Sequence, residues 1–109
     1  MFARFGISAV AAVFAIATVL ASTVSSARAD VFPESSGRFV SGGEARDLGC
    51  DDLWYARNEI FARNGFRFET ARGRAAFGTD GWTRNPHLNR FERANVDLFE
   101  RLEYRNGCR

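Results

Sequence analysis

Residues 51–68 read DDLWYARNEIFARNGFRF, and this stretch combines the clearest helical pattern of the chain with its clearest stop signal. Its apolar residues recur at the three-to-four spacing of a buried helical stripe: Leu53, Ala56 and Ile60, with Phe61 beside them. No Gly or Pro interrupts the pattern before Gly65, which follows Asn64 as a C-terminal stop. The sequence therefore predicts one long helix, which Asp51 or Asp52 would cap.

A second long helix is predicted from Asn89 to about Tyr104. Asn89 is followed three residues later by Glu92, the pattern of a capping box. Apolar residues again recur at helical spacing: Phe91, Ala94, Leu98 and Leu102, with Val96 and Phe99 broadening the stripe. Asn106 and Gly107 would end this helix.

Cys50 and Cys108 are the only cysteines of the chain. An exported chain meets an oxidising compartment, so we expect them to form one intramolecular disulfide. A metal site or an intermolecular bridge is the alternative, but neither has supporting ligands, and His87 is the only histidine. A bond between Cys50, before the first long helix, and Cys108, after the last, would make the two helices antiparallel.

The export prediction rests on residues 1–29, which have the three parts of a secretory signal peptide in order. Arg4 supplies the positive end, residues 6–21 carry no charge, and residues 27–29 read Ala-Arg-Ala, a small-x-small cleavage pattern. We expect cleavage before Asp30. An uncleaved membrane anchor is the alternative, but roughly 16 apolar residues fall short of the ~20 that a spanning helix needs.

Cleavage would change the charge balance of the chain. All fifteen basic residues are Arg, and Arg4 and Arg28 would leave with the signal, so thirteen Arg would face thirteen Asp and Glu. A nearly neutral mature chain gives no electrostatic reason to expect nucleic-acid binding. The remaining residues, about 80 in number, suffice for one small domain.

The rest of the mature chain divides into a lead-in, two short helices and a loop. Residues 30–43 are rich in Ser and Gly and are expected to be an extended lead-in. Ser41 with Glu44 would start a short helix ending near Leu48, and Thr70 would cap another over residues 71–77. In the turn-rich loop that follows, Trp82 would be the apolar residue that holds the loop onto the helices.

These elements predict an all-α domain of about four helices, two of them longer and antiparallel and two of them short, with one disulfide. The predicted divisions are a signal peptide over 1–29, the lead-in over 30–43 and the helical domain over 44–109. No cofactor or metal is expected, and neither is stable membrane insertion after cleavage.

Catalytic patterns are lacking. The sequence contains no Gly-x-Ser-x-Gly turn, no Gly-rich phosphate loop and no Lys, and the predicted disulfide leaves no cysteine free to act as a nucleophile. We therefore expect a protein that is not an enzyme. A small hydrolase using Glu59 or Asp52 is the remote alternative, and it would need a cleft holding a carboxylate of raised pKa.

An arginine-rich and aromatic surface is predicted around the first long helix. Arg57 falls on or beside the buried stripe, where a charge needs a partner, and we expect Glu92 or Glu100 of the last helix to provide it. Aromatic faces suit sugar rings and guanidinium groups suit carboxylates, so this surface is a candidate glycan site. The candidate binding residues are Tyr55, Arg57, Asn58, Glu59, Arg63, Asn64 and Trp82, with Trp54 beside them.

The segments ARNEIFARNGFRF and FERANVDLFE, together with Trp82, Asn85 and Pro86, resemble the bacterial YARHG domain. The likeness extends from about Phe32 to Tyr104. The name motif falls on residues 61–65, with Phe in place of Tyr and Asn in place of His, so the phenol and the imidazole of the motif are missing. The resemblance implies an extracytoplasmic helical domain of unestablished molecular function, with no catalytic residues to carry over.

The favoured hypothesis is a periplasmic or secreted binding module for peptidoglycan or for another envelope protein. The alternative is a structural or protein-interaction domain whose aromatic side chains all belong to the core. Exposure of Trp54, Tyr55 and Trp82 distinguishes the two, because a stacking platform needs an exposed ring face.

Overall fold

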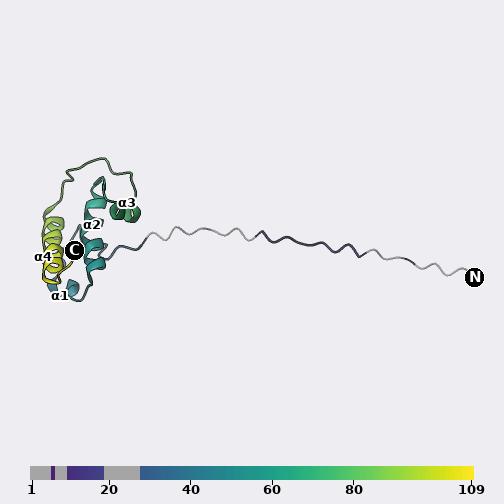
Figure 1. The fold of residues 1–109 in the computed structure, drawn as a ribbon, viewed down its shortest axis with the longest axis horizontal. Helices are drawn as coiled ribbons and strands as arrows, with labels where there is room; N and C mark the ends of the chain where they lie inside the picture. The colour runs from purple at the N-terminus through teal and green to yellow at the C-terminus, as the bar shows by residue number, and fades with distance from the viewer. Residues whose placement is uncertain (1–5, 7–9, 19–27) are drawn as a thin grey trace, which may run out of the picture.

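Two long helices lie side by side, and the shorter elements pack around them (Figure 1). The computed structural model describes residues 6, 10–18 and 28–109. The helices are α1 (Gly42–Ala45), α2 (Cys50–Arg63), α3 (Ala71–Phe77) and α4 (Arg90–Arg105). Within the described residues the only β pairing is an isolated bridge between Phe66 and Thr83, so the predicted all-α class is confirmed.

The predicted disulfide is confirmed and sets the direction of the helix pair. Cys50 is the first residue of α2 and Cys108 follows α4, and their Cα atoms lie 5.4 Å apart. The start of α2 is therefore tied to the end of α4, so the two helices run antiparallel, as expected.

Three of the four predicted helix caps are confirmed. Ser41 and Thr70 accept hydrogen bonds from the first-turn amides of α1 and α3, and Asn89 forms the predicted capping box with Glu92 at the start of α4. The prediction for α2 is wrong, because its cap is Gly49 and the two Asp residues lie inside the first turn. There they face the positive end of the helix dipole without binding its amides.

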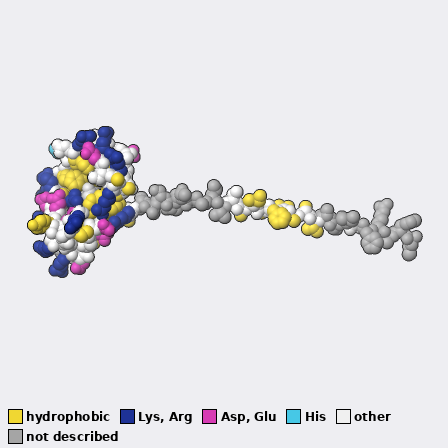
Figure 2. Space-filling view, viewed as in Figure 1, with side chains coloured by type: hydrophobic (Ala, Val, Ile, Leu, Met, Phe, Trp, Pro, Cys, Tyr) yellow, Lys and Arg dark blue, Asp and Glu magenta, His cyan; other side chains and the backbone are white. Residues whose placement is uncertain are grey.

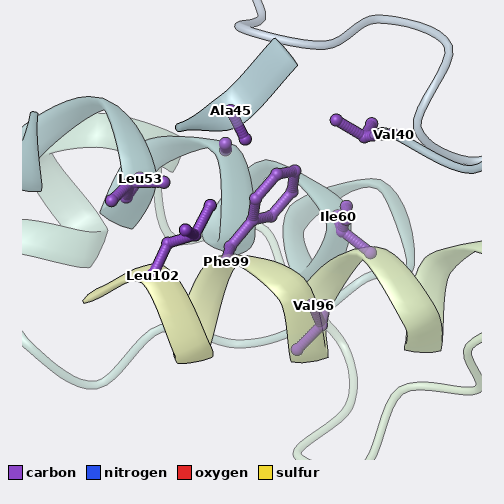
Figure 3. Close-up of a cluster of buried hydrophobic side chains, with 8 residues drawn as sticks. Val40, Ala45, Leu53, Ile60, Val96, Phe99 and Leu102 are labelled. Atoms are coloured by element: carbon purple, nitrogen blue, oxygen red, sulfur yellow. The ribbon is translucent and has the colours of Figure 1, made fainter. Parts of the chain in front are cut away.

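The core lies between α2 and α4 and extends to α1 and the lead-in (Figure 3). Its buried apolar side chains are Val40, Ala45, Leu53, Ala56, Ile60, Val96, Phe99 and Leu102. The predicted apolar stripe of α4 needs correction: Phe91, Ala94 and Leu98 are only half-buried, whereas Glu92 and Asn95 are buried. The helix is rotated because these two polar side chains face inward, where they bind the lead-in.

The lead-in is folded rather than extended. The Ser35 amide donates to the Phe32 carbonyl at 3.1 Å, and the Gly37 amide donates to the Glu34 carbonyl at 2.9 Å, so the chain runs in turns. The Phe32 ring stacks on Phe99 of α4 with the ring centroids 5.5 Å apart. Residues 30–40 therefore form part of the helical domain, because their turns bring Phe32 and Val40 to the core, where burial of apolar groups stabilises the fold.

The loop between α3 and α4 is fastened to the end of α2. The Trp82 amide donates to the Gly65 carbonyl at 2.9 Å, and the Arg67 amide donates to the Thr83 carbonyl at 2.8 Å. Gly65 has a φ of +80°, which favours glycine, and an added Cβ there would lie 2.2 Å from the Trp82 ring. Trp82 thus holds the loop as predicted, although the residue remains 75% exposed.

The predicted signal peptide falls largely outside the described residues. Its described stretch, residues 10–18, is not helical, and Val10, Val13, Phe14 and Ile16 are 85–88% exposed. Among the residues that the structure describes, none of the helices has the length and the apolar character needed to cross a bilayer.

Candidate functional site

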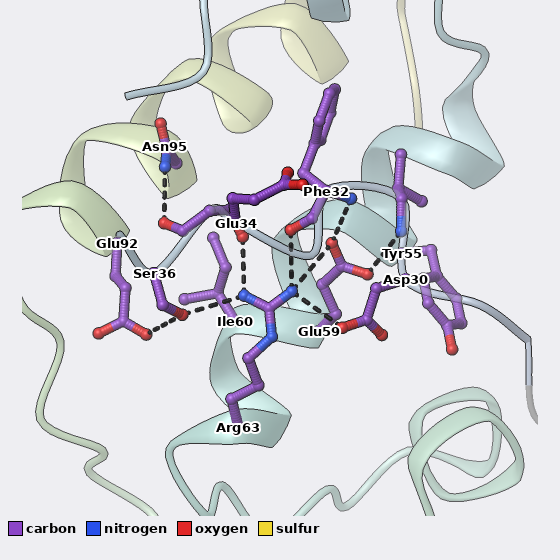
Figure 4. A network of polar contacts seen from close by, with 12 residues as sticks. Asp30, Phe32, Glu34, Ser36, Tyr55, Glu59, Ile60, Arg63, Glu92 and Asn95 are labelled. Carbon is purple, nitrogen blue, oxygen red and sulfur yellow. Dashed lines mark hydrogen bonds and ion pairs between the residues drawn. The ribbon is translucent and has the colours of Figure 1, made fainter. Parts of the chain in front are cut away.

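Glu59 and Arg63 form the centre of a polar network on α2 (Figure 4). They lie one helical turn apart, with Arg63 Nη2 3.4 Å from Glu59 Oε1. The Glu59 side chain is only 1% exposed, and its two oxygens accept hydrogen bonds from the amides of Val31 and Phe32, each at 2.9 Å. Glu59 therefore binds the backbone of the lead-in.

Arg63 binds the same segment from the next turn of the helix. Its guanidinium donates to the Phe32 carbonyl at 2.9 Å and to the hydroxyls of Ser35 and Ser36 at 2.8 and 3.0 Å. It also pairs with the Asp30 carboxylate at 3.1 Å. A single arginine thus contacts four positions of the lead-in, which uses the planar, multiply donating geometry of guanidinium.

The last helix completes this arrangement with two buried polar side chains. Asn95 Nδ2 donates to the carbonyls of Ser35 and Arg38 at 2.7 and 2.8 Å, and its Oδ1 accepts from the Val40 amide at 2.8 Å. Glu92 accepts a hydrogen bond from the Ser36 hydroxyl at 3.0 Å. We call Glu59, Arg63, Glu92 and Asn95 the lead-in cradle.

Asn64 and Asn58 are also engaged in local contacts. Asn64 Nδ2 donates to the Ile60 carbonyl at 2.8 Å and to Glu92 Oε2 at 2.6 Å, so it joins α2 to α4. Asn58 Nδ2 donates to the Trp54 carbonyl one turn earlier, at 2.9 Å. Within the described residues, every buried side-chain nitrogen and oxygen has a hydrogen-bond partner.

Arg57 pairs with Glu103 rather than with the predicted Glu92 or Glu100. Its Nε and Nη2 donate to the two carboxylate oxygens of Glu103 at 2.6 and 3.1 Å. The disulfide sets this register: Arg57 lies about two turns after Cys50, and Glu103 lies between one and two turns before Cys108. The expected ion pair across the two helices thus forms, but closer to the disulfide.

Burial controls the protonation of the two titratable groups closest to the lead-in. It raises the pKa of Glu59, although the amides of Phe32 and Val31 act in the opposite direction. Burial also raises the pKa of Tyr55, and the neighbouring carboxylates of Asp30 and Glu59 add to the effect. A raised carboxyl pKa was the sign sought for a hydrolase, but Glu59 is covered by the chain itself and faces no cleft.

A concave surface lies on the other side of α2, against α3. The Arg72 guanidinium stacks 3.9 Å above the Trp54 ring and pairs with Asp51 at 2.9 Å. The Phe77 ring lies 4.8 Å from Tyr55 and 6.0 Å from Trp54, between centroids. We call this hollow of about 910 Å³ the α2–α3 groove; its lining also includes Arg28 and Arg74.

The seven predicted site residues therefore do not form one site. Arg57 and Asn58 belong to helix contacts, whereas Glu59, Arg63 and Asn64 hold the lead-in or α4. Tyr55, which is 6% exposed, lines the α2–α3 groove, and Trp82 sits on Gly65 beside a separate hollow of about 120 Å³.

Sequence reasoning missed four residues that the structure brings forward. Arg72, Arg74 and Phe77 line the groove, but they lie on a short helix that gave no functional pattern. Asn95 could have been noticed, because an Asn inside a helix and next to apolar positions is costly unless its amide is bound. Among the described residues, no group of three or more His, Cys, Asp or Glu is placed to hold a metal ion.

Comparison with known proteins agrees with the resemblance found in the sequence. A family model described as the YARHG domain matches residues 28–104, which is most of the chain. No curated protein and no solved structure matches the chain. The matched range includes the lead-in, α2, all of α4 except its last residue, and the α2–α3 groove.

Proposed function

The chain belongs to the YARHG domain family, and we propose that it is a periplasmic or secreted binding module without catalytic activity. Its ligand would be a cell-wall glycan such as peptidoglycan or, failing that, another envelope protein. The signal-like residues 1–29 and the disulfide support an exported protein, because disulfides persist in oxidising compartments.

The observation that carries the proposal is the α2–α3 groove. It is the place where Trp and Arg side chains converge on a concave surface, with Trp54 and Arg72 in contact and Arg74 in the wall. Aromatic rings stack on sugar faces, and guanidinium groups bind the carboxylates that many wall glycans carry. The groove therefore offers the combination expected of a site for an acidic glycan.

The surface charge outside the α2–α3 groove gives no support to a nucleic-acid partner. Figure 2 shows basic and acidic side chains interspersed on the face that it presents, with apolar patches between them. Binding to nucleic acid relies on a continuous basic surface. We accordingly propose no nucleic-acid partner.

The position of Glu59 supports the absence of catalysis. A general acid must reach its substrate, and Glu59 is 1% exposed and bound to two amides of the lead-in. Asp52 lies in the first turn of α2, it is half-buried, and it is not among the residues that line the α2–α3 groove. Neither carboxylate therefore resembles the cleft-bound acid that a hydrolase would need.

A purely structural or protein-interaction domain is the second candidate. The observation that favours it is the lead-in cradle, where Arg63 of the name motif binds the protein's own chain. Under this alternative the α2–α3 groove binds no glycan.

Retention on purified peptidoglycan sacculi separates the two candidates. We expect the chain starting at Asp30 to be retained, and Trp54→Ala or Arg72→Ala to reduce retention about tenfold, the loss of roughly 1.4 kcal/mol of binding. Tyr104→Ala is the matched control, because Tyr104 is exposed on α4. If the wild-type chain passes unretained, the glycan proposal is wrong.

Trp82→Ala tests the site that the sequence alone suggested. Trp82 lies outside the α2–α3 groove, so its removal should leave retention unchanged. Loss of retention in Trp82→Ala with normal retention in Trp54→Ala would move the proposed site to the loop between α3 and α4.

A further inference from the structure

The backbone before the lead-in passes between two polar side chains of α2. The Tyr55 hydroxyl donates to the Arg28 carbonyl at 3.2 Å, and the Val31 amide donates to Glu59 Oε2 at 2.9 Å. Asp30 lies between Arg28 and Val31 in the chain, and its side chain is paired with Arg63 (Figure 4). The predicted cleavage point, between Ala29 and Asp30, is thus in direct reach of the domain.

We propose that this place is a binding site for the new chain start, in which Glu59 holds the α-ammonium group that cleavage creates on Asp30. The nitrogen of Asp30 is joined to the Val31 nitrogen through two bonds of the Asp30 backbone and one peptide bond, so the two lie about 3–4 Å apart. It therefore lies within about 7 Å of the Glu59 carboxylate oxygen that the Val31 amide already binds.

The charges around Glu59 favour an additional cation. The groups that face this place are the carboxylates of Glu59 and Asp30, the guanidinium of Arg63 and the phenol of Tyr55. Arg63 serves both carboxylates, at 3.4 and 3.1 Å, so two negative charges share one positive charge. An α-ammonium group on Asp30 would balance this set.

Cleavage would also remove the contacts that Arg28 makes. In the uncleaved chain Arg28 pairs with Asp52, and its guanidinium lies 4.4 Å above the Tyr55 ring, at the edge of the α2–α3 groove. With residue 28 gone, the Tyr55 hydroxyl loses its carbonyl partner and can accept a hydrogen bond from the ammonium group. Cleavage would therefore remove Arg28 from the lining of the α2–α3 groove, and it would add an ion pair between the lead-in and Glu59.

The inference rests on the export part of the proposed function, but its test does not. The chain starting at Asp30 keeps the disulfide and the whole buried core, since all of these lie between residues 31 and 108. We would compare that chain with a free amino terminus, the same chain acetylated at Asp30, and a chain that retains Ala29. Because the uncleaved backbone already passes through this place, an acetyl group removes the charge without a clash.

Two results are expected for the free amine. Its pKa, measured by NMR, should lie above the ordinary range of about 7.7–8.0. Its thermal midpoint near pH 6 should exceed that of the acetylated chain by several degrees, and the chain retaining Ala29 should fall between them. The advantage should be lost as the pH rises through the raised pKa, because the folded state then no longer holds the extra proton.

Glu59→Gln supplies the control for charge. Gln keeps one oxygen for the lead-in amides but removes the negative charge, so acetylation should no longer change the thermal midpoint. If this variant does not fold, the pKa and midpoints of the wild-type chains decide alone. An amino-group pKa at or below its ordinary range, or equal midpoints for the free and acetylated chains, would overturn the proposal.

The origin of the chain start in the cell is checked separately. Mass spectrometry of the exported protein should give an amino terminus at Asp30. An amino terminus at another residue would contradict the predicted cleavage before Asp30. The pKa and the thermal midpoints measured on the chain starting at Asp30 would remain valid in that case. Loss of glycan retention in the experiment on the α2–α3 groove would likewise leave the Glu59 measurements unaffected.

Discussion

The two sides of α2 differ in how their polar groups are used. The lead-in cradle buries Glu59 and Asn95 and gives every nitrogen and oxygen of these side chains a partner within the chain. The α2–α3 groove instead keeps Trp54 half-buried and Arg72 exposed, stacked on each other at a concave surface. The part of α2 that belongs to the lead-in cradle therefore closes the fold, whereas the part that lines the α2–α3 groove is the proposed ligand site.

The difference shows that the most recognisable residues of a small domain can be structural. The name motif covers residues 61–65, and here Arg63 and Asn64 bind the lead-in and α4, while Gly65 provides the seat of Trp82. A domain of about 80 residues has a limited core, so side chains that bind backbone can supply the cohesion that apolar burial lacks.

Removing the disulfide should have the largest effect, and it should weaken the lead-in cradle more than the α2–α3 groove, because the cradle spans α2 and α4. In the Cys50→Ser/Cys108→Ser variant we expect the free energy of unfolding, measured in urea, to fall by about 4 kcal/mol on the chain-entropy estimate for a loop of this length. The amides of Val31 and Phe32 should exchange hydrogen faster, with less change in α3. A uniform change in both regions would show that they unfold as one unit.

Arg63→Ala should have the next largest effect. The change removes four contacts with the lead-in and leaves the buried Glu59 carboxylate without its cation, so we expect a loss of about 3 kcal/mol in urea unfolding. Arg101→Ala, an exposed position on α4, is the matched control and should change stability by less than about 0.5 kcal/mol. Equal losses in the two variants would mean that the cradle does not hold the lead-in.

The sequence was sufficient to predict the helices and their pairing. The capping boxes at Ser41 and Asn89 and the pairing of the two cysteines were confirmed. Apolar periodicity located both long helices, although the buried face that it predicted for α4 was wrong. The rotation of α4 and the folded lead-in were not predicted, because both arise from contacts between residues far apart in the chain. Asn95 binds carbonyls more than fifty residues away, a relation that no local pattern contains.

The candidate site was less accessible to prediction than the fold. Sequence reasoning selected polar residues that lacked an ordinary explanation, such as Arg63 and Asn64, and the structure explains them through contacts with the lead-in and α4. The groove depends on α3, where Arg72 and Phe77 belong to a helix of seven residues. Their convergence on Trp54 follows only from how α3 packs on α2.

Gly65→Ala should affect the loop rather than the cradle. An alanine at a φ of +80° costs about 1–2 kcal/mol, and its Cβ would also displace the Trp82 ring, so we expect at least that loss together with a change in Trp fluorescence. Gly107→Ala is the matched control, because it has a φ of +67° and open space around it. If the two variants lose the same stability and the Trp fluorescence stays constant, the position of Trp82 does not depend on its contact with Gly65.

The smallest expected effect concerns Glu59 and Glu44, whose contributions to the free energy of unfolding should depend on pH with opposite signs. Burial raises the pKa of Glu59 above its ordinary value of 4.5, so its contribution to stability is lost as the pH rises through the raised value. Hydrogen bonds from Arg38 and the Ser41 amide lower the pKa of Glu44 to about 2, so its contribution is present above 4.5 and lost as the pH falls through about 2.

Urea unfolding of Glu59→Gln and Glu44→Gln from pH 2 to pH 7 measures both slopes. Glu59→Gln should flatten the decline that begins above pH 4.5, because Gln removes the buried group that binds a proton more tightly in the folded state. Glu44→Gln should flatten only the acid limb, since the exposed capping box of α1 gains nothing from protonation. The same change of slope in both variants would contradict the distinction between a buried carboxylate in the cradle and an exposed helix cap.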